Sequence, residues 1–320
     1  MYGRRIAFSL LLAFFLISVG LVGVLITLPL NADALLIDIK PGTAVRTLAK
    51  KMFSQGLIPS AWLLEGTVRL LGGRIQAGEY PLAGETTLSF AQNITFGKRY
   101  QYSFTIIEGW DLSQLIEALQ TDSNLSHIRE ISFEEISHNY ESFLAETYFF
   151  EKGYESDHLL ARAHLAMFQV AQSIWEKGCR EVMRSPKDLI VLGSVIEKEA
   201  TLSTEKPAIA NVLLNRLEVN MRLQADPTVF FAVKKPYTQP LNREDLRTQS
   251  PYNTYLVSGL PPGPIGTVSK SAIEAACTPK QGEYYYYVAK GDGTHHFSKT
   301  HDEHIRAVNQ YIRGQDDNQG

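Results

Sequence analysis

The spacing of hydrophobic positions changes several times along the chain, and the N-terminus carries the longest apolar run. Residues 6–30 contain no charged side chain, and Arg4 and Arg5 precede them. A helix needs about 20 apolar residues to cross the hydrocarbon core of a bilayer, and flanking basic residues stay in the cytoplasm. The pattern predicts a cytoplasmic tail at 1–5 and a single transmembrane helix at 6–30, with the rest of the chain outside the cytoplasm.

A cleaved signal peptide is the alternative for this segment. Ala32-Asp33-Ala34 has the small-x-small form of a cleavage site. The hydrophobic region of a signal peptide usually has about 7–15 residues. The run at 6–30 is longer, which favours a retained anchor.

Residues 36–100 combine short apolar runs with helical spacing. A strand is expected at 36–39, before a Pro41-Gly42 turn, and Val45, Leu48 and Met52 then recur at helical spacing. Further helices are expected near 61–71 and 88–95, with a strand in the sequence AGEYPL between them. The pattern predicts a small α+β module.

The remainder divides at Arg184-Ser185-Pro186, a boundary between an intermediate region at 101–184 and a C-terminal region at 185–320. The intermediate region contains a strand in FTIIEG, a helix that begins near Trp110 and a long helix at 157–177. The C-terminal region contains helices, a rigid proline-rich loop at 250–266, a strand in EYYYYVAK and a last helix. The fold class is therefore α+β throughout.

Composition excludes several functions. The chain has 320 residues and a formal net charge of −3, so it lacks the basic field of a nucleic-acid-binding protein. Two cysteines, Cys179 and Cys277, do not have metal-ligand spacing. They are either a disulfide, which an exported domain permits, or buried free thiols.

The sequence VLGSVIEKEA, at 191–200, places carboxylates at the end of an apolar helix. Ser185 is a suitable N-cap and Pro186 a suitable first residue. At about 100° per residue, Glu199 falls in the apolar sector, whereas Glu197 falls at its edge and Lys198 on the polar side with Ser194. We therefore expect Glu199 to lie where water is scarce.

Burial raises the pKa of a carboxyl group and can make a glutamate a general acid at neutral pH. A glycosidic oxygen is one group that such an acid protonates. The structural alternative is a buried Glu199 that bonds to the backbone or to an arginine such as Arg216 or Arg222.

Polar and aromatic residues follow in two nearby segments. The run at 222–228 contains Gln224 and ends in an Asp226-Pro227-Thr228 turn, and the proline-rich loop carries Asn253 and Tyr255. Tyrosines and amides on a rigid loop suit a sugar-binding groove, although Asx turns that stabilise the loop explain the same residues.

Four histidines lie near the C-terminus, and no metal or cofactor is expected. They are His295, His296, His301 and His304. His301 and His304, at i and i+3, are a poor pair of metal ligands on a helix, and no cysteine lies nearby. Surface, core or groove positions are the expected alternatives.

The ordered motifs SVIEKEA, NVLLNRL, MRLQADPTV, SPYNTYLVSGLPPGPI and DGTHHFSKTHDEH closely resemble those of the YceG-like endolytic murein transglycosylases (the MltG family). The resemblance covers residues 36–313 and is densest at 190–304. It implies a catalytic region at 185–320, with Glu199 as catalytic acid and base, and it matches Gln224, Asp226, Asn253 and Tyr255 to groove positions.

The resemblance also implies the setting of this activity. The expected substrate is the peptidoglycan glycan strand, cleaved non-hydrolytically to leave 1,6-anhydroMurNAc ends. The module at 36–100 is expected to be LysM-like. The protein would be a single-pass protein of the cell inner membrane with its bulk in the periplasm, and the wall-synthesis machinery is a candidate partner.

One segment departs from the family pattern. At 141–148 the chain reads ESFLAETY, with Ser142, Ala145 and Glu146 where the family has Gly, Pro and Asp. The departure leaves any role of Glu146 open.

Two other function classes remain open. A peptidoglycan hydrolase would use Glu199 with a second carboxylate such as Asp226, and a wall-binding scaffold would use the first module alone. Anhydro ends would indicate a transglycosylase and reducing ends a hydrolase. Binding without any products would indicate a scaffold.

Overall fold

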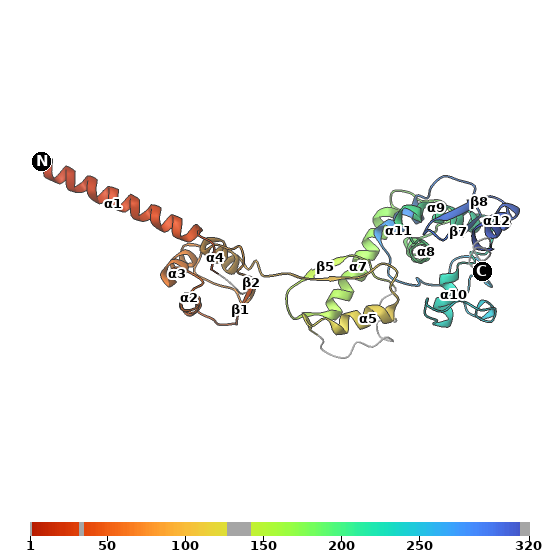
Figure 1. Ribbon diagram of the computed structural model, residues 1–320, viewed down its shortest axis with the longest axis horizontal. Coiled ribbons are helices and arrows are strands. Elements are labelled where there is room, and N and C mark those ends of the chain that lie inside the picture. Colours follow the sequence, from red (N-terminus) through yellow and green to blue (C-terminus); the bar gives the residue numbers. More distant parts are fainter. Residues whose placement is uncertain (1, 32–34, 127–141, 314–320) are drawn as a thin grey trace. The chain divides into compact units, whose positions relative to one another are not determined.

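The computed structural model describes residues 2–31, 35–126 and 142–313, and the chain divides into two compact units (Figure 1). The first comprises Met1–Tyr102 and Phe149–Gly153, and the second comprises Ser103–Tyr148 and Tyr154–Gly320. Most of the region expected at 101–184 falls within the second unit. The prediction of a mixed α+β fold is confirmed.

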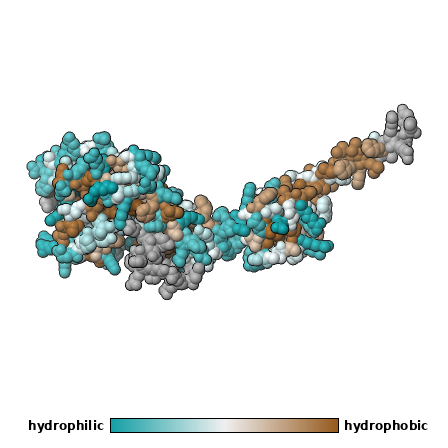
Figure 2. Space-filling model, turned by 180° about the vertical axis from the view of Figure 1, so that it is seen from behind, coloured by the Kyte–Doolittle hydropathy of each residue, from teal (hydrophilic) through white to brown (hydrophobic). Residues whose placement is uncertain are grey.

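The N-terminal helix α1 (Tyr2–Thr27) has a hydrophobic surface (Figure 2). Its segment Phe8–Thr27 is long and apolar enough to cross a membrane. The helix ends before the last residues of the expected span at 6–30: Pro29 forms a β-bridge with Thr86, and Leu30 is only 7% exposed in the core of the first unit.

The rest of the first unit is built on one antiparallel strand pair. The strands β1 (Leu36–Ile39) and β2 (Gly78–Pro81) pair with Ile37 opposite Tyr80. Three helices complete the unit: α2 (Val45–Ser54), α3 (Ala61–Leu70) and α4 (Thr87–Phe96). The core positions follow the expected spacing and include Leu48, Met52, Leu64, Tyr80 and Phe90.

The second unit has a helical core. The helix α8 (Pro186–Glu199) lies against α7 (Ser156–Trp175) and α11 (Lys270–Cys277), and also contacts α9 (Lys206–Glu218) and α10 (Asp226–Val233). It is buried from Leu189 to Glu197. The other described helices and turns of this unit are α5 (Leu112–Thr121), α12 (His301–Val308), the 3₁₀ turns at Ser203–Glu205 and Asp245–Arg247, and a π-helical turn at Asn309–Arg313.

The remaining strands form short two-stranded sheets. These are β3 (Tyr102–Thr105) with β5 (Thr147–Phe150), β4 (Leu125–Ser126) with β6 (Tyr154–Glu155), and β7 (Tyr286–Ala289) with β8 (His295–Ser298). The strand expected in EYYYYVAK is present as β7, but it is half-buried, because its partner β8 leaves it in a two-stranded sheet.

Cys179 and Cys277 form a disulfide with their Cα atoms 4.7 Å apart. The bond joins the segment after α7 to the end of α11. The two cysteines are therefore a disulfide and not buried free thiols, the alternative that the sequence left open.

Candidate active site

The helix α8 begins as the sequence predicts. The Ser185 Oγ accepts a hydrogen bond from the Asp188 N–H at 3.2 Å, and Pro186 occupies the first turn. The helix ends at Glu199, because Ala200 takes an extended conformation with φ −85° and ψ 108°. Glu199 therefore lies at the negative end of the helix dipole, which disfavours a charged carboxylate.

The expected polar side of α8 is covered from Leu189 to Glu197. Ser194 is completely buried, with its Oγ donating to the Val191 carbonyl at 2.7 Å and accepting from the Ile265 N–H at 3.0 Å. Glu197 is 8% exposed, although its position at the edge of the apolar sector predicted more contact with solvent. Neighbouring segments cover the helix and supply hydrogen-bond partners for these polar groups.

Both carboxylate oxygens of Glu197 are occupied within the protein. Its Oε1 lies 2.5 Å from Lys206 Nζ, and its Oε2 accepts hydrogen bonds from the Ser269 N–H at 2.9 Å and the Ser269 Oγ at 2.5 Å. Glu197 is therefore a structural residue, whereas Glu199 reaches a cavity.

This cavity has a volume of about 420 Å³ and a mostly polar lining. Its walls come from the end of α8, from α9, from the segment that leads into α10, from the proline-rich loop, and from β7 and α12. The lining residues are Glu199, Arg216, Gln224, Asp226, Tyr255, Tyr286, Tyr287, His301, His304 and Ile305.

The environment of Glu199 favours its protonated form. Burial and then the negative charge of Asp226 raise its pKa to about 7, against an opposing hydrogen bond from Tyr287 and the positive charge of Arg216. A carboxyl group with this pKa is partly protonated at neutral pH and can both give and take a proton. Carboxyl groups in such surroundings are suited to general acid–base chemistry.

Asp226 is held by a tyrosine. The Tyr255 hydroxyl donates a hydrogen bond to Asp226 Oδ1 at 2.6 Å. Asp226 begins the helix α10, so the expected Asp-Pro-Thr turn is the first turn of that helix, with proline at a position that helices accept. The sequence residues Asp226 and Tyr255 are thus brought together with Glu199 at one cavity.

Gln224 also lines the cavity, and its backbone is unusual. It has a φ of 50°, in the left-handed region that non-glycine residues rarely enter. Its N–H donates to the Thr254 carbonyl at 3.1 Å. This bond connects the segment before α10 to the proline-rich loop.

Asn253, which was expected in the groove, is not among the residues that line the cavity. It is completely buried, and its Nδ2 donates to the carbonyls of Leu246 at 3.1 Å and Thr248 at 2.9 Å. Its Oδ1 accepts from the Tyr255 N–H at 3.0 Å. Asn253 therefore shapes the loop that presents Tyr255, the role that the Asx-turn alternative gave it.

Arg216 brings a positive charge to the cavity without forming an ion pair with Glu199 in the described part of the chain. Its guanidinium donates to the carbonyls of Tyr285 and Leu223, both at 2.6 Å. Its Cζ lies 5.3 Å from the centroid of the Tyr286 ring. The structural alternative of a Glu199–Arg216 pair is thus not observed.

Two of the four histidines belong to this cavity. The His304 ring stacks on Tyr286 with centroids 5.2 Å apart, and burial lowers its pKa. His295 instead pairs with Glu205, with Nδ1 2.7 Å from Oε2. Within residues 2–31, 35–126 and 142–313, no group of three or more His, Cys, Asp or Glu side chains is arranged to hold a metal ion.

Tyr286, Tyr287 and Ile305 also line the cavity, although no motif in the sequence singles them out. The tyrosine run in EYYYYVAK is visible in the sequence, but strand alternation would send Tyr286 and Tyr287 to opposite faces, whereas both line the cavity. The pairing of β7 with β8 and the placement of α12 are long-range contacts that spacing alone does not reveal.

The divergent segment packs away from Glu199. Glu141 lies outside the described residues, whereas Ser142 is 3% exposed and the Ala145 N–H donates to the Val268 carbonyl at 2.8 Å. Glu146 does not line the 420 Å³ cavity.

Comparisons with known proteins agree with the resemblance that the motifs carry. A family model described as the YceG-like family matches residues 37–310. An endolytic murein transglycosylase of Bacillus subtilis (strain 168) is 31% identical over 307 residues, which cover 86% of this chain and 84% of that protein. One of Streptococcus pneumoniae serotype 2 (strain D39) is 30% identical over 130 residues, 39% of this chain and 24% of that protein.

A solved structure shows the same fold. The crystal structure of a YceG-like protein from Listeria monocytogenes matches with a TM-score of 0.51 and 25% identity. The match covers 85% of this chain and 98% of the other.

Proposed function

Because the chain belongs to the YceG-like family, we propose that it is a peptidoglycan lytic transglycosylase in which Glu199 is both the catalytic acid and the catalytic base. Its relatives in Bacillus and Streptococcus are named endolytic murein transglycosylases. The observation that carries the residue assignment is the Glu199 carboxyl, with a pKa of about 7 in a polar cavity.

The reaction proceeds without water as nucleophile. Protonated Glu199 gives its proton to the glycosidic oxygen between MurNAc and GlcNAc, and the bond from that oxygen to C1 breaks. The C6 hydroxyl oxygen of the same MurNAc forms a bond to C1, and its proton passes to the Glu199 carboxylate. One residue thereby returns to its starting state, and the product is a 1,6-anhydroMurNAc end.

Four neighbours support this cycle. Asp226 keeps the pKa of Glu199 high, and Tyr255 holds Asp226 in place. Arg216 limits the rise in pKa and favours the carboxylate that forms after proton transfer. Gln224, on the exposed side of the cavity, is placed to hydrogen-bond a sugar.

We assign the second unit to the outside of the cytoplasm, with α1 as a retained anchor in the cell inner membrane. The disulfide supports this orientation, because such bonds persist in oxidising compartments and are rare in the cytosol. Cleavage would then occur close to the membrane, where glycan strands are new, and the wall-synthesis machinery is a candidate neighbour.

We further assign glycan binding to the LysM-like module at 36–100. Chains that begin at residues 36 and 103 should differ in their binding to purified wall, with weaker binding by the shorter chain. The shorter chain loses the ion pairs Arg99–Glu151 and Lys152–Glu79, whose side chains are partly exposed. Such pairs contribute about 1 kcal/mol or less to stability, so we expect the shorter chain to fold. If it folds and binds the wall as well as the longer chain, the module is only a spacer.

The decisive test is product analysis with Glu199→Gln. The amide cannot supply a proton, so we expect cleavage of purified peptidoglycan to fall by at least about 10²–10⁴-fold while the fold is kept. Glu205→Gln, which removes a carboxylate outside the cavity, is the control. Near-normal cleavage by folded Glu199→Gln contradicts the assignment.

Digestion in ¹⁸O-labelled water distinguishes the reaction classes. A transglycosylase yields unlabelled anhydro ends, whereas a hydrolase that uses Asp226 yields labelled reducing ends. Binding to the wall without products would instead indicate a scaffold.

A further inference from the structure

The middle residue of the Glu-Lys-Glu sequence, Lys198, takes no part in the proposed proton transfer. Its side chain passes between two glycines: a Cβ built on Gly266 would lie 2.9 Å from Lys198 Cε, and one built on Gly109 would lie 3.7 Å from its Cγ. The Lys198 Nζ lies 4.5 Å from the centroid of the Tyr237 ring. The fold therefore reserves a path for this side chain and places its ammonium group at a defined point.

The ammonium group lies at a second cavity of the same unit, which has a volume of about 460 Å³. It lies between the start of α5 and the end of α10. Its lining consists of Asp111, Leu112, Ser113, Lys198, Phe230, Phe231, Lys234, Lys235, Pro236, Tyr237 and Ile265. We call it the lysine pocket.

The lysine pocket is apolar at its wall and positively charged. Phe230 and Tyr237 stack with their ring centroids 4.4 Å apart. Lys235 is neutralised by Asp245, with 2.6 Å between Nζ and Oδ2, and Asp111 is the acidic residue of the lining. In the described part of the chain neither Lys198 nor Lys234 is within salt-bridge distance of a carboxylate, but burial lowers the pKa of Lys198 and the charge of Asp111 opposes this shift. The pocket suits a ligand that has both carboxylate groups and apolar groups.

The lysine pocket is next to the candidate active site. Lys198 precedes Glu199 directly, and α10 has Asp226 of the active-site cavity at its start and Phe230 of the lysine pocket in its second turn. At about 1.5 Å per residue, Asp226 and Lys234 are roughly 12 Å apart along the helix axis. The charges of Glu199 and Asp226 also raise the pKa of Tyr237, after burial as the main cause.

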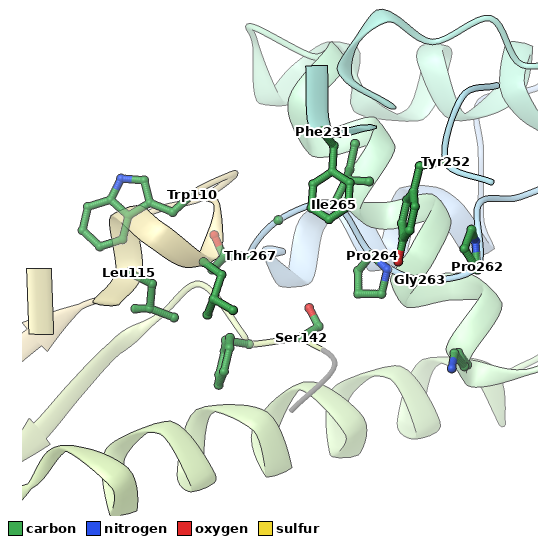
Figure 3. Close-up of a pocket in the computed structure, with 14 residues that line it drawn as sticks. Trp110, Leu115, Ser142, Phe231, Tyr252, Pro262, Gly263, Pro264, Ile265 and Thr267 are labelled. Atoms are coloured by element: carbon green, nitrogen blue, oxygen red, sulfur yellow. The ribbon is translucent and has the colours of Figure 1, made fainter. Parts of the chain in front are cut away.

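A third cavity adjoins the lysine pocket. It shares Leu112, Phe231 and Ile265 with the lysine pocket. Figure 3 shows Phe231, Ile265 and Tyr252 together on one side of this cavity, with Trp110 on the other. A long ligand therefore has room to continue beyond the lysine pocket.

We propose that the lysine pocket binds the stem peptide that the glycan carries beside the cleaved bond, with Lys198 and Lys234 pairing with peptide carboxylates. This inference rests on the proposed function for its substrate. Stem peptides combine carboxylates with small apolar side chains, whereas the sugar backbone has no charge of its own. The pocket would make the enzyme select glycan strands whose peptides carry free carboxylates.

The test compares two forms of one substrate. Both forms are fluorescently labelled, uncrosslinked glycan strands that carry their peptides. In the acidic strand the peptide carboxylates are free, and in the amidated strand they have been converted to amides. Binding is measured with the full-length chain in detergent, in a Glu199→Gln background that prevents turnover.

Lys198→Met removes the ammonium group and still fills the path between the two glycines. Lys234→Asn removes the other charge at a position with a φ of 52°, which asparagine tolerates. Lys270→Gln, an exposed lysine of α11, is the control.

We expect each pocket variant to weaken binding of the acidic strand about three- to tenfold and to leave binding of the amidated strand unchanged. The preference for the acidic strand should decrease as salt is raised. Equal weakening of both strands, or no weakening of either by folded Lys234→Asn, overturns the proposal. Wild-type protein that makes no anhydro ends but keeps charge-dependent binding would refute the proposed reaction and retain the pocket.

Discussion

Glu197 and Lys206 form an ion pair in the interior of the second unit, with 2.5 Å between Oε1 and Nζ. Their side chains are 3% and 2% exposed. Lys206 Nζ also donates to the hydroxyl groups of Ser269 and Ser271, each at 3.0 Å, and to Glu108 Oε2 at 3.3 Å. The pair thus joins the ends of α8, α9 and α11 two residues before Glu199.

Removing one partner of this pair should destabilise the protein strongly. Because Glu197 is then left buried without its cationic partner, Lys206→Met should lower the free energy of unfolding by about 3–5 kcal/mol. Glu197→Gln leaves Lys206 paired with the partly exposed Glu108, so its loss should be smaller. Chemical denaturation measures this effect. The double variant should recover part of the loss, and Lys270→Gln, which removes an exposed pair, should change it by less than about 1 kcal/mol. Additive losses in the double variant would show that the two residues act independently.

The pH dependence of cleavage should report the proton on Glu199. Since the acid form is required and its pKa is about 7, kcat/KM should fall about tenfold per pH unit above that value. Asp226→Asn removes a negative charge that raises this pKa, so the alkaline limb should move to lower pH. Tyr255→Phe keeps that charge and should leave the limb in place while lowering the rate. An unmoved limb in Asp226→Asn would disprove this electrostatic role.

The same carboxyl group should reduce stability at alkaline pH. Its pKa is about 7 in the folded protein against an ordinary value of 4.5, so the folded state binds more protons between these values. The free energy of unfolding contributed by this group therefore falls as pH rises from about 4.5 to 7. Glu199→Gln lacks this penalty and should be more stable than wild type at pH 8, by up to roughly 3 kcal/mol. Thermal unfolding at pH 5 and pH 8 measures the difference, which should be smaller at pH 5.

The disulfide should contribute measurably to the second unit. It closes a sequence separation of 98 residues, and loss of such a bond typically costs about 2–5 kcal/mol. Cys179→Ala with Cys277→Ala should therefore lower the free energy of unfolding by this amount. Reductant should destabilise wild type and leave the double variant unaffected. A wild-type protein that is insensitive to reductant under unfolding conditions would contradict the prediction.

The topology can be tested with reporters at the C-terminus. Because α1 is long and apolar enough to span a membrane, a reporter that works only outside the cytoplasm should be active. The mature protein should keep residues 6–30 and remain in the membrane fraction. A mature N-terminus near Leu35 would indicate a cleaved signal peptide instead.

The local sequence determined the elements that depend on neighbours in the chain. The N-cap at Ser185, the first-turn proline at Pro186 and the apolar spacing of α8 were predicted because capping and periodicity are short-range effects. The apolar helix α1 followed from composition alone. The position of Glu199 in the helix likewise predicted restricted contact with water, and the environment of its carboxyl group agrees.

Only the tertiary structure decided which polar groups are buried and which face the cavity. Lys206 and Ser269 lie on other elements, so helical phase could not show that Glu197 is enclosed. Asn253 looked available on a loop, yet its Nδ2 donates to the carbonyls of Leu246 and Thr248, which precede that loop. The sequence also could not pair Cys179 with Cys277, or bring Tyr287 and His304 to Glu199. These contacts join residues far apart in the chain, and their energies depend on packing that only the complete fold provides.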